Sequence, residues 1–269
     1  MSRRVRLSRA EYRAVRVQVS NDTYLALAPV DSLTVSMAAV AALVATAFAL
    51  IVADRWHRRR LDHHGAWMVA MVLFATGSFA LWWATSAGWS SGVFRVFFTT
   101  GAVLNVSWLA LGSIALHASR RTVARLRAVL ALLSTFALGV MTVAPEKKPF
   151  VADDFPQARD HFGALPRTLA AVGSGIPALV IIGLALWSLS RLIQRRAQSG
   201  GYGATRFGAT RLVASNVLVA IATLVLSASG SLAGRLGEEQ AFAVTLSVGV
   251  VILFVGFMVP SIRSAQRAT

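Results

Sequence analysis

The sequence predicts an all-α polytopic membrane protein, a bundle of seven transmembrane helices. Hydrophobic residues make up 56% of the 269-residue chain and charged residues only 14%, whereas soluble domains average about 25% charged residues. The mean hydropathy is +0.62. The apolar residues come in long blocks, and in lipid a helix satisfies its own backbone hydrogen bonds. Composition and block structure together exclude a soluble globular domain and a disordered chain.

Each of seven blocks is close to the roughly 20 apolar residues that a spanning helix needs. The predicted spans are Leu33–Ala53, Ala66–Ala87, Val93–His117, Ala128–Val143, Thr168–Ser190, Leu212–Gly234 and Ala241–Val259. The fourth is short for a span. Between the fourth and the fifth, the segment Ala144–Arg167 contains four prolines, which predicts an extended, turn-rich connection.

The basic residues predict the orientation, because cytoplasmic loops collect Lys and Arg. Six basic residues fall on one side: Arg95, Lys147, Lys148, Arg159, Arg167 and Arg235. Fifteen fall on the other: Arg55, Arg58, Arg59, Arg60, Arg120, Arg121, Arg125, Arg127, Arg191, Arg195, Arg196, Arg206, Arg211, Arg263 and Arg267. The side with fifteen is predicted to be cytoplasmic, with the N-terminus outside and the C-terminus inside.

The N-terminal arm, residues 1–32, conflicts with this orientation because it carries six arginines on the predicted outer side. Three explanations are open: the arm is translocated, it lies on the membrane as a basic amphipathic segment, or translation begins at Met37. The last is favoured. The expected organisation is therefore this arm, a seven-helix domain over residues 33–260 and a short cytoplasmic tail over residues 261–269.

The predicted spans contain no Asp, Glu or Lys. Proton pumps, ion-coupled transporters and voltage sensors need ionisable groups within the membrane, and retinal proteins need a lysine in the seventh helix, so these classes are excluded. The chain has no cysteine, which excludes disulfides, thiolate catalysis and iron–sulfur clusters. No catalytic residue is predicted.

Small and polar residues form stripes along several spans, and helix packing is the favoured explanation. The alternative is a polar cavity lined by Asn105 and Asn216, with Arg95 as a third candidate. Arg95 could instead pair with an acid from the outer loops. In the fifth span, Pro177 follows Gly173-Ser174-Gly175 and predicts a kink.

Two groups of residues are candidate metal ligands. His57, His63, His64 and His117 lie at predicted cytoplasmic helix ends, where imidazoles could bind a metal or haem. Asp153, Asp154 and His161 lie in the outer connection and carry ligand types that suit a divalent cation. Interfacial histidines and solvated loop charges are the favoured explanations, because neither group has the spacing of a known metal motif.

The stretch Gly101–Gly112, with Gly88-Trp89 and Phe94-Arg95 before it, resembles a segment of uncharacterised seven-helix integral membrane proteins of actinobacteria. That family has no known activity or cofactor. The resemblance implies a single seven-helix unit from about Met37 onward, with Arg95, Asn105 and Trp108 as a structural signature.

The leading functional hypothesis is a non-enzymatic sensor, scaffold or partner subunit of the bacterial cytoplasmic membrane. The alternative is a carrier or channel for a neutral or lipophilic small molecule. A third hypothesis is a metal- or haem-dependent membrane enzyme that uses one of the two ligand groups. The expected partners are anionic lipid at the Arg-rich loops and another membrane protein. The formal charge of +16 is explained by those loops and predicts no binding of nucleic acid.

Overall fold

A computed structural model describes residues 32–198, 217–226 and 239–258. The chain divides into two units, Met1–Ser32 and Leu33–Thr269, and the following concerns the second. All regular elements among the described residues are helical, which confirms that prediction, and six helices are long and apolar enough to cross a membrane. The count of seven stays a prediction. Of the predicted span Leu212–Gly234, the structure describes only the apolar helix Val217–Leu226.

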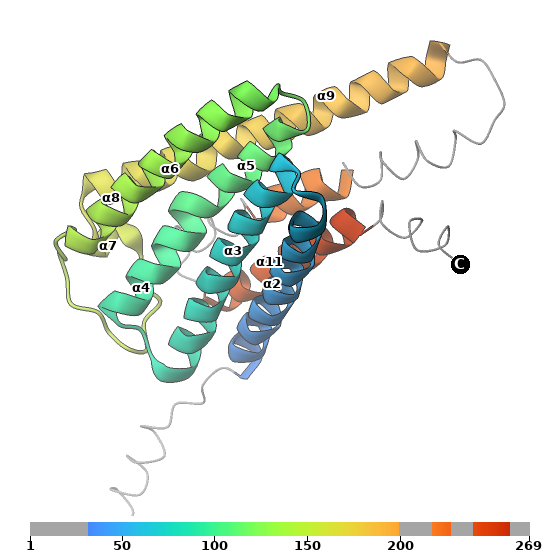
Figure 1. Cartoon of the computed structure of the whole chain (residues 1–269). Coiled ribbons are helices and arrows are strands. Elements are labelled where there is room, and N and C mark those ends of the chain that lie inside the picture. Colours follow the sequence, from blue (N-terminus) through green and yellow to red (C-terminus); the bar gives the residue numbers. More distant parts are fainter. Residues whose placement is uncertain (1–31, 199–216, 227–238, 259–269) are drawn as a thin grey trace, which may run out of the picture. The chain divides into compact units, whose positions relative to one another are not determined.

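Two of the six spans are composite (Figure 1). The α-helices are α2 Ser32–Arg59, α3 Asp62–Ala87, α4 Ser91–Phe97, α5 Asn105–Ala115, α6 Arg120–Val143, α7 Ala158–His161, α8 Ala164–Ala170, α9 Ile176–Gln198 and α11 Glu239–Met258. The π-helix η1, Phe98–Leu104, joins α4 to α5, and the π-helix η2, Ala171–Gly175, joins α8 to α9. The continuous spans are thus Ser91–Ala115 and Ala164–Arg191.

Helix α2 packs through a stripe of alanines. Ala38, Ala41 and Ala45 are fully buried, at helical spacings that place them on one face. Small side chains let helix backbones approach closely in a membrane. On α11, the Ser247 hydroxyl donates to the carbonyl oxygen of Met37 at 2.6 Å. This bond joins the first and last described helices of the unit.

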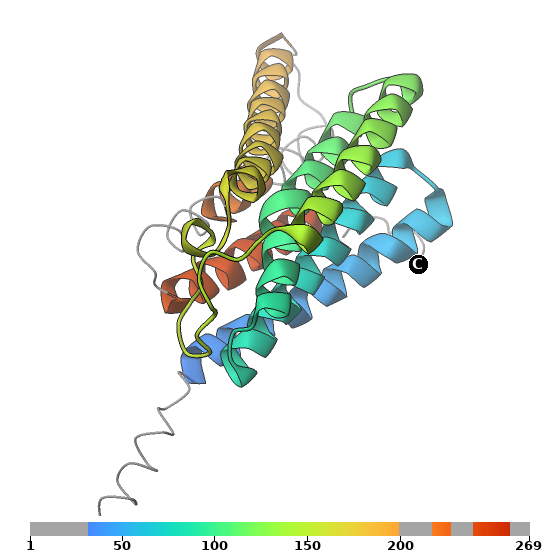
Figure 2. The same cartoon turned by 90° about the vertical axis from the view of Figure 1, so that its left-hand side faces the viewer.

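Helix α3 ends at Gly88, where the chain turns into α4. Gly88 has φ +91°, a conformation that glycine adopts without strain. A methyl group there would also stand 2.9 Å from the Cβ atom of Ala152, and the next residue, Trp89, donates its N–H to the Ala152 carbonyl at 2.9 Å. The connection between α6 and α8 therefore lies against the α3–α4 turn (Figures 1 and 2).

Helix α6 is longer than the sequence predicted, since it begins at Arg120 and not at Ala128. The Ser119 side chain caps it by accepting a hydrogen bond from the Thr122 N–H, as N-cap serines do. The arginines of its first two turns are exposed, so they lowered the hydropathy without ending the helix. Arg127 forms an ion pair of 3.3 Å with Asp62, the first residue of α3.

The two π-helical segments lie against each other. Gly173 of η2 approaches the Val103 carbonyl of η1 so closely that a methyl group on Gly173 would overlap its oxygen. Pro177 has no N–H to give the carbonyl four residues earlier, which is that of Gly173. The Ser107 hydroxyl of α5 donates to this carbonyl at 2.7 Å. Where the sequence predicted a kink at Pro177, the structure has the π-helical segment η2 just before this residue, and a side chain from the other composite span satisfies the Gly173 carbonyl.

Replacing Gly173 by alanine is expected to destabilise the protein by about 1–3 kcal/mol, because the obstructing atom belongs to the backbone of η1 and cannot rotate away. The midpoint of thermal unfolding in mild detergent measures the effect. The matched control is Gly183→Ala in α9, where nothing lies within 4 Å of the added carbon and alanine is the better helix former. Equal midpoints for the two variants would contradict the close approach.

Candidate ligand-binding cavity

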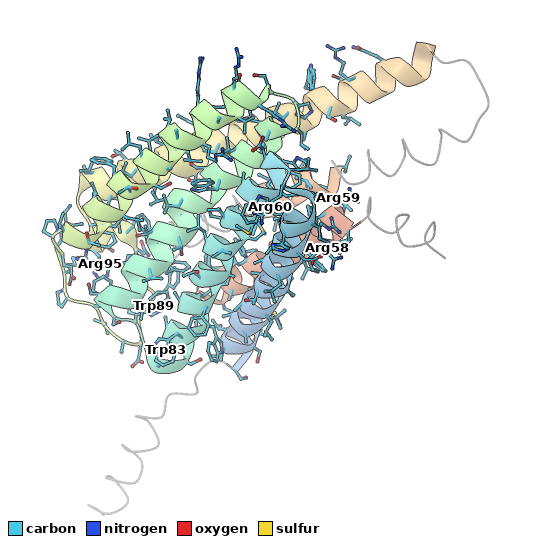
Figure 3. The ribbon with its side chains drawn as sticks, in the orientation of Figure 1. Arg58, Arg59, Arg60, Trp83, Trp89 and Arg95 are labelled. Carbon is cyan, nitrogen blue, oxygen red and sulfur yellow. The ribbon has the colours of Figure 1, made fainter. Side chains whose placement is uncertain are left out.

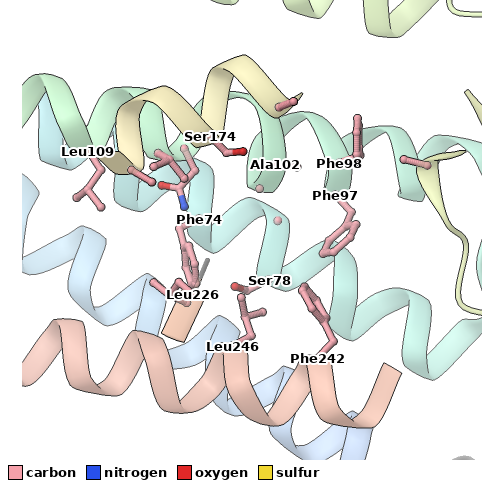
Figure 4. Close-up of a pocket in the computed structure, with 18 of the residues that line it drawn as sticks. Phe74, Ser78, Phe97, Phe98, Ala102, Leu109, Ser174, Leu226, Phe242 and Leu246 are labelled. Carbon is pink, nitrogen blue, oxygen red and sulfur yellow. The ribbon is translucent and has the colours of Figure 1, made fainter. Parts of the chain in front are cut away.

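A cavity of about 540 Å³ lies within the helical unit. Among the described residues, six parts of the chain line it: α3, the composite span from α4 to α5, the segment Phe155–Ala158, the span that contains η2, the helix Val217–Leu226 and α11. Its volume falls within the range of about 300–1,000 Å³ that is typical of small-molecule sites. Figure 4 shows Phe74 and Ser78 of α3, Leu226, and Leu246 and Phe242 of α11 around this space.

None of the described residues that line the cavity is charged, and five are polar: Ser78, Asn105, Gln157, Ser174 and Thr223. The hydroxyls of Ser174 and Thr223 donate within their own helices, to the carbonyls of Ala170 and Val219. Asn105 and Gln157 differ, since the side-chain oxygen of each is buried and has no hydrogen-bond partner. These two oxygens are the groups that a bound molecule could satisfy.

Both π-helical segments contribute directly to the cavity. Gly101 and Ala102 of η1 line it, as do Ala171, Ser174 and Gly175 on the η2 side. Asn105, the first residue of α5, donates its backbone N–H to the Thr100 carbonyl, five residues back. A π-turn inserts one residue into a helix and so redirects the side chains that follow it. The site is therefore built where the two composite spans depart from regular α-helix.

Aromatic residues line the end of the cavity that is nearest the connection between α6 and α8. Phe97 and Phe242 lie edge to face, with ring centroids 5.6 Å apart, and Phe155 contacts Phe242 at 5.7 Å. Trp89 packs behind them, 5.6 Å from Phe97 and 5.4 Å from Phe155. The sequence did not single out Phe155 or Gln157, because a turn-rich connection has no periodicity that would place it over a helix bundle.

Of the three residues predicted to line a cavity, Asn105 lies on its wall and Asn216 falls outside the described residues. Arg95 is not among the lining residues. It caps the end of α6 by donating to the carbonyls of Met141 and Ala144, and it forms an ion pair of 3.1 Å with Glu146. The alternative partner predicted for Arg95, an acid of the outer connection, is thus confirmed.

The histidines predicted at the other end of the helices do not form one cluster. His63 and His64 are ring neighbours at 4.3 Å, whereas His117 packs edge to face on Trp187 of α9. Within residues 32–198, 217–226 and 239–258, no three metal-ligand side chains gather. The buried Nδ1 atom of His64 has no hydrogen-bond partner in the structure.

The second predicted ligand group is also separated. His161 is buried and stacks on Phe150 at 4.0 Å, with its Nδ1 atom 3.1 Å from the Lys148 carbonyl. Asp153 and Asp154 are exposed on the same segment. His161 therefore serves to pack the outer connection onto the bundle, beside Phe94.

The described lining of the cavity carries groups that can bind a ligand. Its described lining offers aromatic and aliphatic surface, hydroxyls and amides. The hydroxyl of Ser174 lies between glycines, yet it donates to the Ala170 carbonyl at 2.7 Å. A nucleophile needs a base within hydrogen-bond reach, and the described lining residues include no His, Lys, Asp or Glu.

Glu146 is expected to make the end of the bundle beside Arg95 sensitive to acid. Hydrogen bonds from the Ser91 hydroxyl and then from Arg95 hold the pKa of Glu146 below its ordinary value. A carboxylate with a lowered folded-state pKa adds stability above its ordinary pKa of 4.5, and this stability is lost as the pH falls and the group is protonated. The thermal midpoint of the wild type should therefore exceed that of Glu146→Gln at pH 7 and approach it in acid.

The control for this pH series is Asp153→Asn, which removes an exposed carboxylate from the same segment. Its midpoint should follow that of the wild type at every pH. A gap between wild type and Glu146→Gln that stayed constant from pH 7 to pH 3 would show that the carboxylate does not hold the outer end.

Comparison of the chain with protein-family models, with curated proteins and with solved structures finds no match. The resemblance to actinobacterial membrane proteins therefore gains no support from these comparisons. Function has to be argued from the cavity, because fold-level similarity would in any case say little about activity.

Proposed function

We propose that this chain is a membrane-embedded sensor that binds a small, neutral and mainly apolar molecule in its cavity. The observation that carries the proposal is the absence of charge among the described residues around about 540 Å³ of space, two of which have a buried amide oxygen without a partner. Apolar walls with a few polar groups are typical of small-molecule sites. A charged ligand would be left without a counter-charge in this lining, at a high desolvation cost.

We further propose that the protein resides in the cytoplasmic membrane, with a seventh span over Leu212–Gly234, the N-terminus outside and the C-terminus inside. The basic residues support this orientation. Figure 3 shows Arg58, Arg59 and Arg60 at one end of the helices and Trp83, Trp89 and Arg95 at the opposite end. The arginine-rich end would also attract anionic lipid headgroups.

The orientation can be tested by labelling single cysteines, since the chain has none of its own. In intact cells, a membrane-impermeant maleimide should label Asp153→Cys. It should label Arg58→Cys only after the membrane is permeabilised. Both positions are exposed, so access to the reagent is set by the membrane alone. The reverse pattern would contradict the proposed orientation.

Ligand binding can be tested by native mass spectrometry of the protein purified in mild detergent. We expect an additional mass that Gly101→Leu removes, because Gly101 lines the cavity and has open space where a side chain would begin. The matched control is Gly139→Leu on α6, which also has open space and lies outside the cavity lining. It should retain the mass. A mass kept by both variants would place the ligand elsewhere.

The second candidate function is that of a carrier for the same class of molecule. The two π-helical segments beside the cavity favour it, because such turns interrupt the regular hydrogen-bond ladder and often mark functional sites in helices. Transport into proteoliposomes of the molecule found by mass spectrometry separates the two functions. A carrier moves the molecule across the bilayer, whereas a sensor binds it without transport. A polypeptide that co-purifies with a sensor would be the partner that receives the signal.

A further inference from the structure

Two of the five polar residues in the described lining, Asn105 and Gln157, have a side-chain oxygen without a hydrogen-bond partner, and these two contact points come from different parts of the chain. Asn105 begins α5, in the middle of a membrane span, and only 6% of the residue is exposed. Gln157 lies in the connection that closes the outer end. A buried amide oxygen without a partner is energetically costly, so each oxygen favours a ligand that donates a hydrogen bond to it.

The two contact points lie at different depths. Phe155, two residues before Gln157, contacts Phe97, with ring centroids 6.5 Å apart. Asn105 follows Phe97 by eight residues, roughly 12 Å of α-helical rise and somewhat less through π-turns. A compact molecule would reach one oxygen and leave the other unpaired, whereas an elongated molecule can reach both.

The described lining between the two contact points is mainly apolar, although the Ser78 hydroxyl also lies there. Phe74, Phe97 and Phe242 belong to it, together with Leu226 and Leu246 (Figure 4). The position of Gln157 is fixed locally, because its backbone carbonyl accepts the N–H groups of Asp160 and His161 at 2.9 and 3.3 Å. The first turn of α7 thus fixes the backbone of Gln157 where the residue lines the cavity.

We infer that the cavity selects an elongated, neutral molecule with an apolar body and a hydroxyl or N–H group at each end, one bound by Asn105 and the other by Gln157. This inference rests on the proposed binding function and adds the class of ligand. A hydroxyl group suits both ends, because it can donate to the amide oxygen and also accept from the amide nitrogen.

Three probes of equal chain length test the inference: octane-1,8-diol, octan-1-ol and octane. The protein is reconstituted in nanodiscs, and apparent affinity is obtained from the shift of the thermal midpoint with probe concentration. Gly101→Leu, with the cavity filled, serves as the blank for effects of the probes on the bilayer. Affinities are compared between variants for the same probe, which cancels the partitioning of that probe into lipid.

The variants are Asn105→Leu and Gln157→Met, with Thr135→Val on the exposed face of α6 as a polar-to-apolar control. Each cavity variant should weaken diol binding about fivefold or more, the size of one net hydrogen bond, and leave octane unchanged. The affinity for octan-1-ol should fall less in each single variant, because this molecule can bind in the opposite orientation and donate to the amide oxygen that remains. The control should change none of the three affinities.

Two results would overturn the inference in distinguishable ways. If no probe stabilises the wild type relative to Gly101→Leu, the cavity does not bind molecules of this class, and the proposed binding function fails with it. If all three probes bind, but the variants weaken the diol and octane equally, the cavity binds apolar molecules without using the two amides. Gln157→Met lies outside the spans, so this second result does not depend on whether Asn105→Leu folds.

Discussion

The close approach of Gly173 to the Val103 carbonyl sets the geometry on which the site depends. Only a residue without a side chain fits there, and the contact joins the two spans that carry a π-helical segment. Because Pro177 cannot supply an N–H to Gly173, the free carbonyl is available to the Ser107 hydroxyl across the interface. Sterics and hydrogen bonding thus hold the same pair of segments together. Residues on both sides of this contact, among them Ala102 and Ser174, then line the cavity.

The membrane environment explains why the polar groups are distributed as they are. Buried polar groups have few alternatives in lipid, so most hydroxyls of the described spans donate to a carbonyl one turn back in their own helix, as Thr46, Thr99 and Thr223 do. Arg95 and His117 are the ionisable residues within the predicted spans, and His117 is the last residue of its span. Arg95 lies near the C-terminal end of α6. There its donors meet the last carbonyls of α6 and the Glu146 carboxylate, where the helix dipole also favours a positive charge. Against this background, the unpartnered oxygens of Asn105 and Gln157 stand apart as groups open to a ligand.

Hydropathy predicted the existence of the six described spans, because a run of about 20 apolar residues leaves few other structures in a membrane. Hydropathy predicted the ends of the helices less accurately, as at the start of α6. The arginines of Arg120–Arg127 lowered the local hydropathy although the residues are helical, since exposed basic side chains extend into the interface. Asn105 was identifiable as a polar residue at mid-span. Gln157 was not, because its position depends on tertiary contacts of a proline-rich connection, such as that of Trp89 with Ala152. In the span that contains η2, Pro177 indicated a departure from regular α-helix. The span that contains η1 has no proline that would have indicated one.

The outer connection links the stability of the bundle to the closure of the cavity. It begins at the end of α6, where Arg95 binds Ala144 and Glu146. It continues through Phe150 and His161, whose rings stack and pack beside Phe94, and it supplies Phe155 and Gln157 to the cavity wall. These contacts include an ion pair, aromatic contacts and backbone hydrogen bonds. Because Phe155 and Gln157 line the cavity, moving the segment would open this end of it. A ligand held by both Asn105 and Gln157 would oppose that movement, because it would bridge the connection to the helix that carries the deeper amide. In the orientation and function that we propose, binding in the cavity would thereby act on the segment that faces the outside, which is the coupling that a sensor requires.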